Sequence, residues 1–122
     1  MKKQEIDQFE TIQGQLQAFH TEMGALVKKN PNDPLNAFKL QLVNAVLRKA
    51  NGFLGKARLP FAEFEAFEDS ALPSTSDVLV IVAQYLSTFE KFRSENIHLD
   101  FDSWYWKGPD NIRTAPPKKL RP

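Results

Sequence analysis

Few residues in this chain have types and a spacing that could support chemistry, and the first pair is Arg93 and His98 in the stretch RSENIH. A histidine can act as a general acid or base, and an arginine can stabilise the charge that develops on a phosphorane. Four residues separate the two, close to the end of a predicted helix. The pair therefore suggests RNA cleavage without a metal ion as one hypothesis.

This spacing is similar to the Arg-x(4–6)-His motif of HEPN-type ribonucleases, which are all-helical domains of similar size. The resemblance implies that Arg93 and His98 act together at a dimer interface. It covers only these two residues, because Ser94 stands where a more polar residue usually follows the arginine. The alternation after residue 96 also places His98 in a strand. We keep the ribonuclease as a minor alternative and otherwise expect no catalytic residue and no enzyme.

The last 22 residues, FDSWYWKGPDNIRTAPPKKLRP, place aromatic side chains before basic ones. Rings can stack on bases and cations can bind phosphates, so nucleic acid is a possible partner of this basic tail. The nucleic-acid-binding residues of this alternative are Trp104, Trp106, Lys118, Lys119 and Arg121. Three clustered cations predict weak affinity, and the tryptophans are expected to belong to the fold.

Two other patterns have simpler structural explanations. The stretch NGFLGK resembles a phosphate-binding loop, but Gly52 and Gly55 are expected to end a helix. His98, Asp100 and Asp102 alternate along a predicted strand and are expected to face solvent. We therefore predict no metal site and no cofactor, and the chain shows no evident site for a small-molecule substrate.

A stripe of phenylalanines recurs every three residues between acidic side chains. It is either part of the core or an apolar patch rimmed by acid, which is typical of protein-docking surfaces. Lys39 lies in the apolar arc of the second predicted helix, where it either extends to solvent or forms an interfacial ion pair. The residues predicted to bind a protein partner are Phe61, Phe64, Phe67, Glu65, Glu68 and Lys39.

Length and composition fit one globular domain. The chain has 122 residues, of which 42% are hydrophobic, and it has no cysteine, which excludes disulfides and thiolate metal sites. The longest apolar run, 78–83, is too short to span a bilayer, and the N-terminus does not resemble a signal peptide. We expect a cytoplasmic protein that does not insert into membranes.

Charge is strongly segregated along the chain. Residues 34–58 contain five basic and no acidic side chains, whereas residues 59–102 contain nine acidic and two basic ones. Blocks of this kind usually meet one another in the fold or meet a partner of opposite charge.

Three helices are predicted, over residues 5–29, 34–51 and 77–95. The first carries an apolar heptad seam, which fits an intramolecular helix hairpin or a homodimer equally well. Proline at residue 34, after Asp33, is expected to begin the second helix, and Ser74 with Asp77 has capping-box spacing. A short strand is predicted over 97–101, followed by a hairpin of residues 104–107 and 112–114.

The predicted fold is a mainly α three-helix bundle, a helix hairpin plus a third helix, with a Phe-rich connector over residues 57–76 and a small C-terminal β-hairpin. Residues 1–114 form a single domain, and residues 115–122 form a flexible basic, Pro-rich tail. The predicted function is a non-enzymatic protein–protein interaction module, a small subunit or accessory protein of a larger complex. Its partner is a different protein or a second copy of the chain.

Overall fold

The computed structural model describes residues 1–118 and confirms a mainly α chain with three long helices. These are α1 (Lys3–Lys29), α2 (Ala37–Leu54) and α3 (Thr75–Glu95), with a short 3₁₀ helix, η1 (Lys56–Arg58), after α2. A small antiparallel sheet follows α3 and consists of β1 (Ile97–Asp100), β2 (Ser103–Trp106) and β3 (Arg113–Thr114), in that order.

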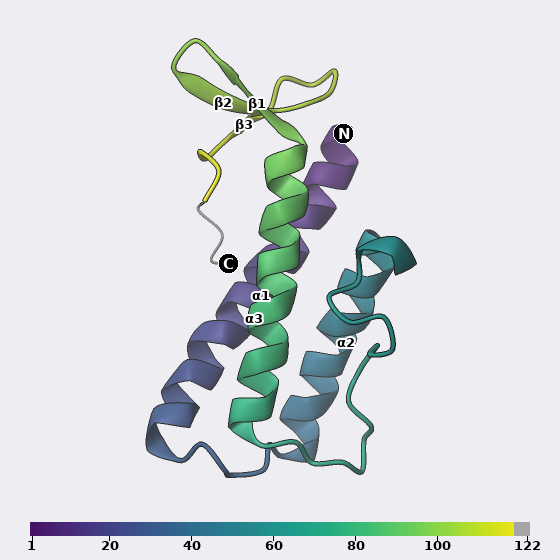
Figure 1. Cartoon of the computed structure of the whole chain (residues 1–122), viewed down its shortest axis with the longest axis vertical. Helices are drawn as coiled ribbons and strands as arrows, with labels where there is room; N and C mark the ends of the chain where they lie inside the picture. The colour runs from purple at the N-terminus through teal and green to yellow at the C-terminus, as the bar shows by residue number, and fades with distance from the viewer. Residues whose placement is uncertain (119–122) are drawn as a thin grey trace.

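The helices pack side by side, with α1 antiparallel to both α2 and α3 (Figure 1). The chain descends through α1, rises through α2 and returns downward in an extended connector that lies along α2 (Figure 1). Helix α3 then rises to the sheet, which lies near the N-terminus of α1 (Figure 1). The connector is therefore long because α2 and α3 run in the same direction.

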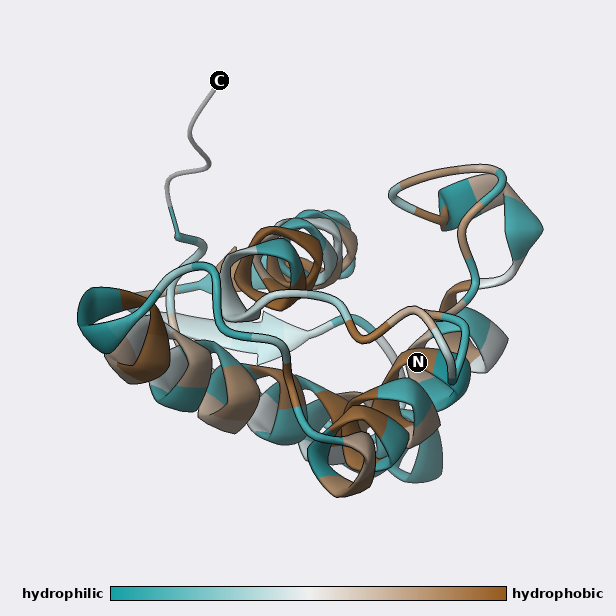
Figure 2. Cartoon of the chain, turned by 90° about the horizontal axis from the view of Figure 1, so that it is seen from below, coloured by the Kyte–Doolittle hydropathy of each residue, from teal (hydrophilic) through white to brown (hydrophobic). Residues whose placement is uncertain are grey.

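The heptad seam of α1 packs in the hydrophobic core of the chain itself. Four of its residues are buried, and Phe19 and Leu26 are half-buried against the core. Teal and brown alternate around each helix, as expected of amphipathic helices that share one core (Figure 2). The buried residues of the seam are Phe9, Ile12, Leu16 and Met23.

An aromatic cluster joins the three helices to the sheet. Phe9 lies at its centre, with the ring centroids of Phe53, Phe89, Phe92 and Trp106 between 5.1 and 5.8 Å away. Phe9 comes from α1, Phe53 from α2, and Trp106 from β2. Because large rings bury much apolar area, this cluster fixes the sheet on the bundle.

Helix α2 begins three residues later than the sequence predicts. Its N-cap is Asn36, whose Oδ1 accepts the Lys39 N–H at 2.8 Å. Residues 33–35 instead pair with the start of α3, since Leu35 N–H donates to Pro73 O at 2.8 Å. This long-range pairing overrides the local signal of Pro34. At the other end Gly55, with φ +75°, is the C-cap, and Gly52 lies within the helix, so NGFLGK ends a helix as expected.

The capping box of α3 is confirmed. Ser74 Oγ accepts the Asp77 N–H at 3.1 Å, and Asp77 Oδ2 accepts the Ser74 N–H at 3.2 Å. The helix begins at Thr75, two residues before its predicted start.

The C-terminal β-structure is larger than the predicted hairpin, because β1 pairs with β2 as well as β2 with β3. Its 107–110 loop contacts the N-terminal end of α1, where Lys3 N–H donates to Asp110 Oδ2 at 2.8 Å. Gly108 has φ +143°, and a Cβ there would clash with the main chain of Met1. A side chain at residue 108 is therefore excluded by both backbone conformation and space.

Candidate functional site

A buried ion pair on α3 connects the bundle to the C-terminal segment, which we define as residues 113–118. Arg93 is 4% exposed, and its Nε and Nη2 donate to the two carboxylate oxygens of Glu90 at 2.9 and 2.7 Å. The two residues are three apart on one face of the helix, which brings the side chains together.

Arg93 also binds the C-terminal segment directly. Its Nη1 donates to Thr114 Oγ1 at 2.9 Å and to Ala115 O at 2.8 Å, and Nη2 donates to Pro116 O at 2.9 Å. Together with the two bonds to Glu90, these use all five N–H donors of the guanidinium. No donor of Arg93 is left for a substrate phosphate in this arrangement.

Glu90 completes the attachment from the acceptor side. Its Oε2 accepts the main-chain N–H of Lys118 at 2.9 Å, in addition to the bond from Arg93. Burial alone would raise the pKa of this carboxyl, but the hydrogen bonds from Arg93 and Lys118 outweigh burial and hold the pKa below its ordinary value. Residues 115–118 are therefore held on the bundle, in contrast to the free tail expected from residue 115 onward.

His98 is not part of this arrangement. It lies on β1, is exposed, and is paired across the sheet with Tyr105, whose ring centroid is 6.3 Å from its own. The predicted pair of Arg93 and His98 is thus divided between a buried ion pair and an exposed strand position. The helix ends between them, at Glu95, so sequence spacing did not translate into a shared site.

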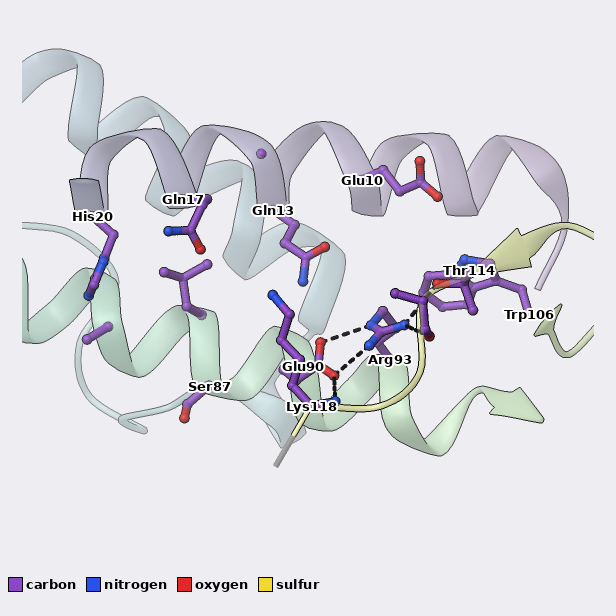
Figure 3. Close-up of a pocket in the computed structure, with 14 residues that line it drawn as sticks. Glu10, Gln13, Gln17, His20, Ser87, Glu90, Arg93, Trp106, Thr114 and Lys118 are labelled. Atoms are coloured by element: carbon purple, nitrogen blue, oxygen red, sulfur yellow. Dashed lines mark hydrogen bonds and ion pairs between the residues drawn. The ribbon is translucent and has the colours of Figure 1, made fainter. Parts of the chain in front are cut away.

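A groove runs between α1 and α3 and has a volume of about 660 Å³ (Figure 3). Each wall is a stripe along one helix that extends over eleven residues. The α1 wall consists of Glu10, Gln13, Gly14, Gln17 and His20. The α3 wall consists of Ala83, Leu86, Ser87, Glu90 and Arg93. One end is closed by Trp106 and the C-terminal segment (Figure 3).

Trp106 has a donor without a partner in the described residues. The side chain is 1% exposed, lines the groove, and its buried Nε1 makes no hydrogen bond there. A buried polar group left unpaired costs about 1–3 kcal/mol, so most such groups in proteins are satisfied. Trp106 therefore contributes a buried hydrogen-bond donor, without an acceptor in residues 1–118, beside the closed end of the groove.

The Phe-rich connector is attached to α2 by two asparagines. Asn44 is fully buried; its Nδ2 donates to Phe67 O at 2.8 Å, and its Oδ1 accepts the Phe67 N–H at 3.0 Å. Asn51, seven residues later on the same face, donates to Glu65 O at 2.7 Å and accepts from Tyr85 Oη at 2.5 Å. These bonds satisfy main-chain groups that an extended segment would otherwise leave unpaired.

The three phenylalanines of the connector divide into two groups. Phe64 and Phe67 are half-buried, pack on the core and contact each other with ring centroids 5.1 Å apart. Phe61 is 42% exposed, and Glu65 and Glu68 are exposed beside it along the connector. The two possibilities for the stripe are thus realised at different positions: Phe64 and Phe67 belong to the fold, and Phe61 lies at the surface.

Lys39 lies on another side of α2. It is five positions before Asn44, which corresponds to about 140° around the helix. Its side chain is half-buried, and the two ion pairs between residues 1 and 118, Arg58–Glu95 and Glu90–Arg93, do not include it. The structure therefore does not bring Lys39 together with the connector.

The predicted nucleic-acid residues are also separated. Trp106 is buried, so its ring cannot stack on a base, which corrects that assignment, and Trp104 is half-buried against the core. Lys118 is exposed in the C-terminal segment. Lys119 and Arg121 lie outside the described residues.

Within residues 1–118, no group of three or more histidine and acidic side chains is arranged to hold a metal ion. None of the helices in this range is both long enough and apolar enough to cross a membrane.

Sequence reasoning missed the asparagines, Glu90 and Trp106 as parts of these sites. Asn44 and Asn51 carry a usable signal, because a polar residue among buried positions at helical spacing needs a partner. Glu90 also carries a usable signal, because it lies three residues before Arg93 and residues three apart share one face of a helix. The unpaired Nε1 of Trp106 has no sequence signal, since it depends on what surrounds the ring.

Comparison of the chain with family models, with curated proteins and with solved structures found no match. The sites therefore rest on their geometry and chemistry alone.

Proposed function

We propose that this chain is a non-enzymatic protein-interaction module, a small subunit or accessory protein of a larger cytoplasmic complex. The observation that carries the proposal is the exposed ring of Phe61 at the start of an acidic segment that α2 holds in place. We call residues 61–69 the connector surface. Its partner is a basic protein segment that places an apolar side chain against Phe61.

The attachment of the connector supports this function. The side-chain amides of Asn44 and Asn51 donate to the main-chain carbonyls of Phe67 and Glu65 and fix the segment there, while the side chains of Glu63, Glu65 and Glu68 remain exposed. A partner therefore meets a surface that is already ordered, which lowers the entropic cost of association.

Charge complementarity supports a basic segment as the partner. Four acidic side chains lie within residues 63–69, with no basic one among them. An apolar centre within an acidic rim favours a basic segment, because opposite potentials steer association and suppress partners of the wrong charge. We expect the affinity to fall as salt screens the exposed carboxylates.

The test compares affinity capture by the tagged wild-type chain with capture by Phe61→Ser, in the presence of nuclease. A matched control is Phe101→Ser, which removes a ring that is 95% exposed on the β1–β2 turn. The proposal expects a basic partner that is retained by Phe101→Ser and lost from Phe61→Ser. Charge reversal by Glu65→Lys with Glu68→Lys should have the same effect as Phe61→Ser.

Other outcomes count against the proposal. A partner captured equally by wild type and Phe61→Ser does not use the connector surface. A set of partners that disappears on nuclease treatment favours nucleic-acid association instead. Circular dichroism of each variant shows whether the fold is intact.

A further inference from the structure

Helix α2 carries an apolar stripe that residues 1–118 leave exposed. Phe38 is 69% exposed and Leu42 is 45% exposed, and the two lie one turn apart on the same face of the helix. Ala45 and Lys49 continue this face and are also exposed. We call Phe38, Leu42, Ala45 and Lys49 the α2 stripe. Neighbouring exposed apolar side chains on one helix face are typical of an interaction surface.

We propose that the α2 stripe binds the connector surface of a second copy of this chain, in a two-fold dimer that contains this contact twice. The inference rests on the function proposed for the connector surface, and it identifies the basic segment that this surface binds. The heptad seam of α1 packs in the core of its own chain, so the dimer uses α2 instead.

Charge complementarity supports a second copy as the occupant. Helix α2 contains three basic side chains and no acidic one, whereas residues 61–69 contain four acidic side chains and no basic one. Neither of the two ion pairs between residues 1 and 118 joins α2 to the connector. Each chain therefore carries both halves of a contact that it does not make within itself, and a second copy supplies both halves.

The stripe and the connector surface lie on different sides of α2. Asn51 holds the connector through the carbonyl of Glu65 at 2.7 Å, and Lys49 lies two positions earlier, about 160° away around the helix. Lys49 instead lines a hollow between α1 and α2, together with Asp7 and Gln8. Lys49 is therefore turned away from the connector of its own chain, and a contact between the two requires two chains.

A two-fold axis parallel to α2 brings the two surfaces together. It places the stripe of each chain beside the connector of the other and keeps the residues of both chains at the same height along the helix. Lys49 is about 3 Å in height from the residue that holds Glu65, so we expect its ammonium beside the Glu65 carboxylate of the second copy. Leu42 is equally close in height to Asn44, which binds Phe67, so we expect it against the rings of the connector.

The experiment measures the dissociation constant of the dimer by sedimentation equilibrium of the full-length chain, from about 1 µM to about 1 mM. We expect Lys49→Glu and Glu65→Lys each to raise this constant at least about fivefold, because each change places like charges together at both contacts. The double variant Lys49→Glu with Glu65→Lys should recover the wild-type constant, and an equimolar mixture of the two single variants should form a mixed dimer. Lys91→Glu, at an exposed position of α3, is the control for a change of charge alone.

The apolar part of the contact has its own variants. Leu42→Ser and Phe61→Ser should each weaken the dimer at least about tenfold, as for loss of a central contact. Val80→Ser removes a side chain that is 57% exposed on α3 and should leave the dissociation constant unchanged. Circular dichroism of each variant shows whether the fold is intact.

The proposal is overturned if the wild-type chain stays monomeric up to about 1 mM. It is also overturned if a dimer forms that Lys49→Glu or Phe61→Ser does not weaken, or if the double variant associates no better than the single variants.

The capture experiment distinguishes failure of the dimer from failure of the connector. A monomeric chain that loses a basic cellular partner through Phe61→Ser keeps the function proposed for the connector and refutes only the dimer. A dimer that follows the charge exchange, while Phe61→Ser retains every other captured protein, supports the dimer and counts against a different protein at the connector.

Discussion

Two extended segments of this chain are attached to helices through their main chain, and the attachments differ in charge. The connector is bound to α2 by the neutral amides of Asn44 and Asn51. The C-terminal segment is bound to α3 by the ion pair of Glu90 and Arg93. Both satisfy main-chain groups, but only the second depends on keeping two opposite charges together in a buried position. The two attachments should therefore respond differently to truncation and to pH.

The largest expected effect is the loss of one charge of the pair. Arg93→Ala removes five hydrogen bonds and leaves the Glu90 carboxylate buried without its counter-ion. We expect the free energy of unfolding to fall by about 3–5 kcal/mol, measured by urea denaturation. The double variant Glu90→Leu with Arg93→Met should lose less, because no unpaired charge remains.

Lys91→Ala is the control for Arg93→Ala, since Lys91 is exposed on the same helix and should change stability by less than about 0.5 kcal/mol. If Arg93→Ala behaves like Lys91→Ala, the ion pair does not hold the C-terminal segment.

Loss of the neutral attachment of the connector should lower the free energy of unfolding by a smaller amount. Asn44→Ala leaves the N–H and C=O of Phe67 without partners, and we expect a loss of about 1–3 kcal/mol in the free energy of unfolding. Limited proteolysis should also cut the connector faster than in wild type. Gln41→Ala, at an exposed position of α2, should leave both measurements unchanged. Equal proteolysis of Asn44→Ala and Gln41→Ala would mean that the amide does not fix the connector.

The pH dependence of the free energy of unfolding distinguishes the two attachments, because only the attachment of the C-terminal segment includes a group that titrates. The pKa of Glu90 is lower in the folded chain than its ordinary value of 4.5, so the unfolded chain binds more protons as the pH falls below that value. The stabilisation is present above the ordinary pKa and is lost as pH falls through the lowered folded pKa. Urea denaturation at a series of pH values should show this loss in wild type.

Glu90→Gln cannot titrate, so its free energy of unfolding should fall less steeply over the same pH interval. Asn44→Ala should keep the wild-type slope, because its attachment carries no proton. Parallel curves for wild type and Glu90→Gln would contradict the role given to Glu90.

The smallest expected effect concerns Tyr85, which donates to Asn51 in the neutral attachment. Burial raises the pKa of the Tyr85 hydroxyl, the bond to Asn51 lowers it in part, and nearby Glu65 raises it further. Tyr85→Phe removes one hydrogen bond and leaves the bond from Asn51 to Glu65 in place. We expect a loss of about 0.5–1.5 kcal/mol in urea denaturation.

A loss in Tyr85→Phe as large as that in Asn44→Ala would contradict the minor contribution given to the bond between Tyr85 and Asn51.

Much of the fold follows from local patterns. The heptad spacing of α1 and the capping box at Ser74 and Asp77 predicted helices that the structure contains, because both signals act over a few residues. The predicted start of α2 at residue 34 was wrong. Leu35 N–H donates to Pro73 O, which is far away in the sequence, and local patterns do not show such a bond. Residues 115–118 were expected to be free because their partners, Glu90 and Arg93, lie on another element.

The candidate sites were predictable in part. The acidic phenylalanine stripe was identified, but the sequence did not show that Phe61 is exposed while Phe64 and Phe67 are half-buried. The tryptophans were expected to belong to the fold, and Trp106 is buried in its aromatic cluster. The pairing of Arg93 with Glu90 instead of His98 depended on where α3 ends.

The sequence by itself determined the three amphipathic helices, their order and the strand-forming C-terminal region. These depend on periodicity and caps, which are properties of neighbouring residues. Only the tertiary structure decided which extended segments lie on which helix, which phenylalanine reaches solvent and which buried donor lacks a partner. Those features depend on groups far apart in the chain, whose meeting is set by packing of the whole core.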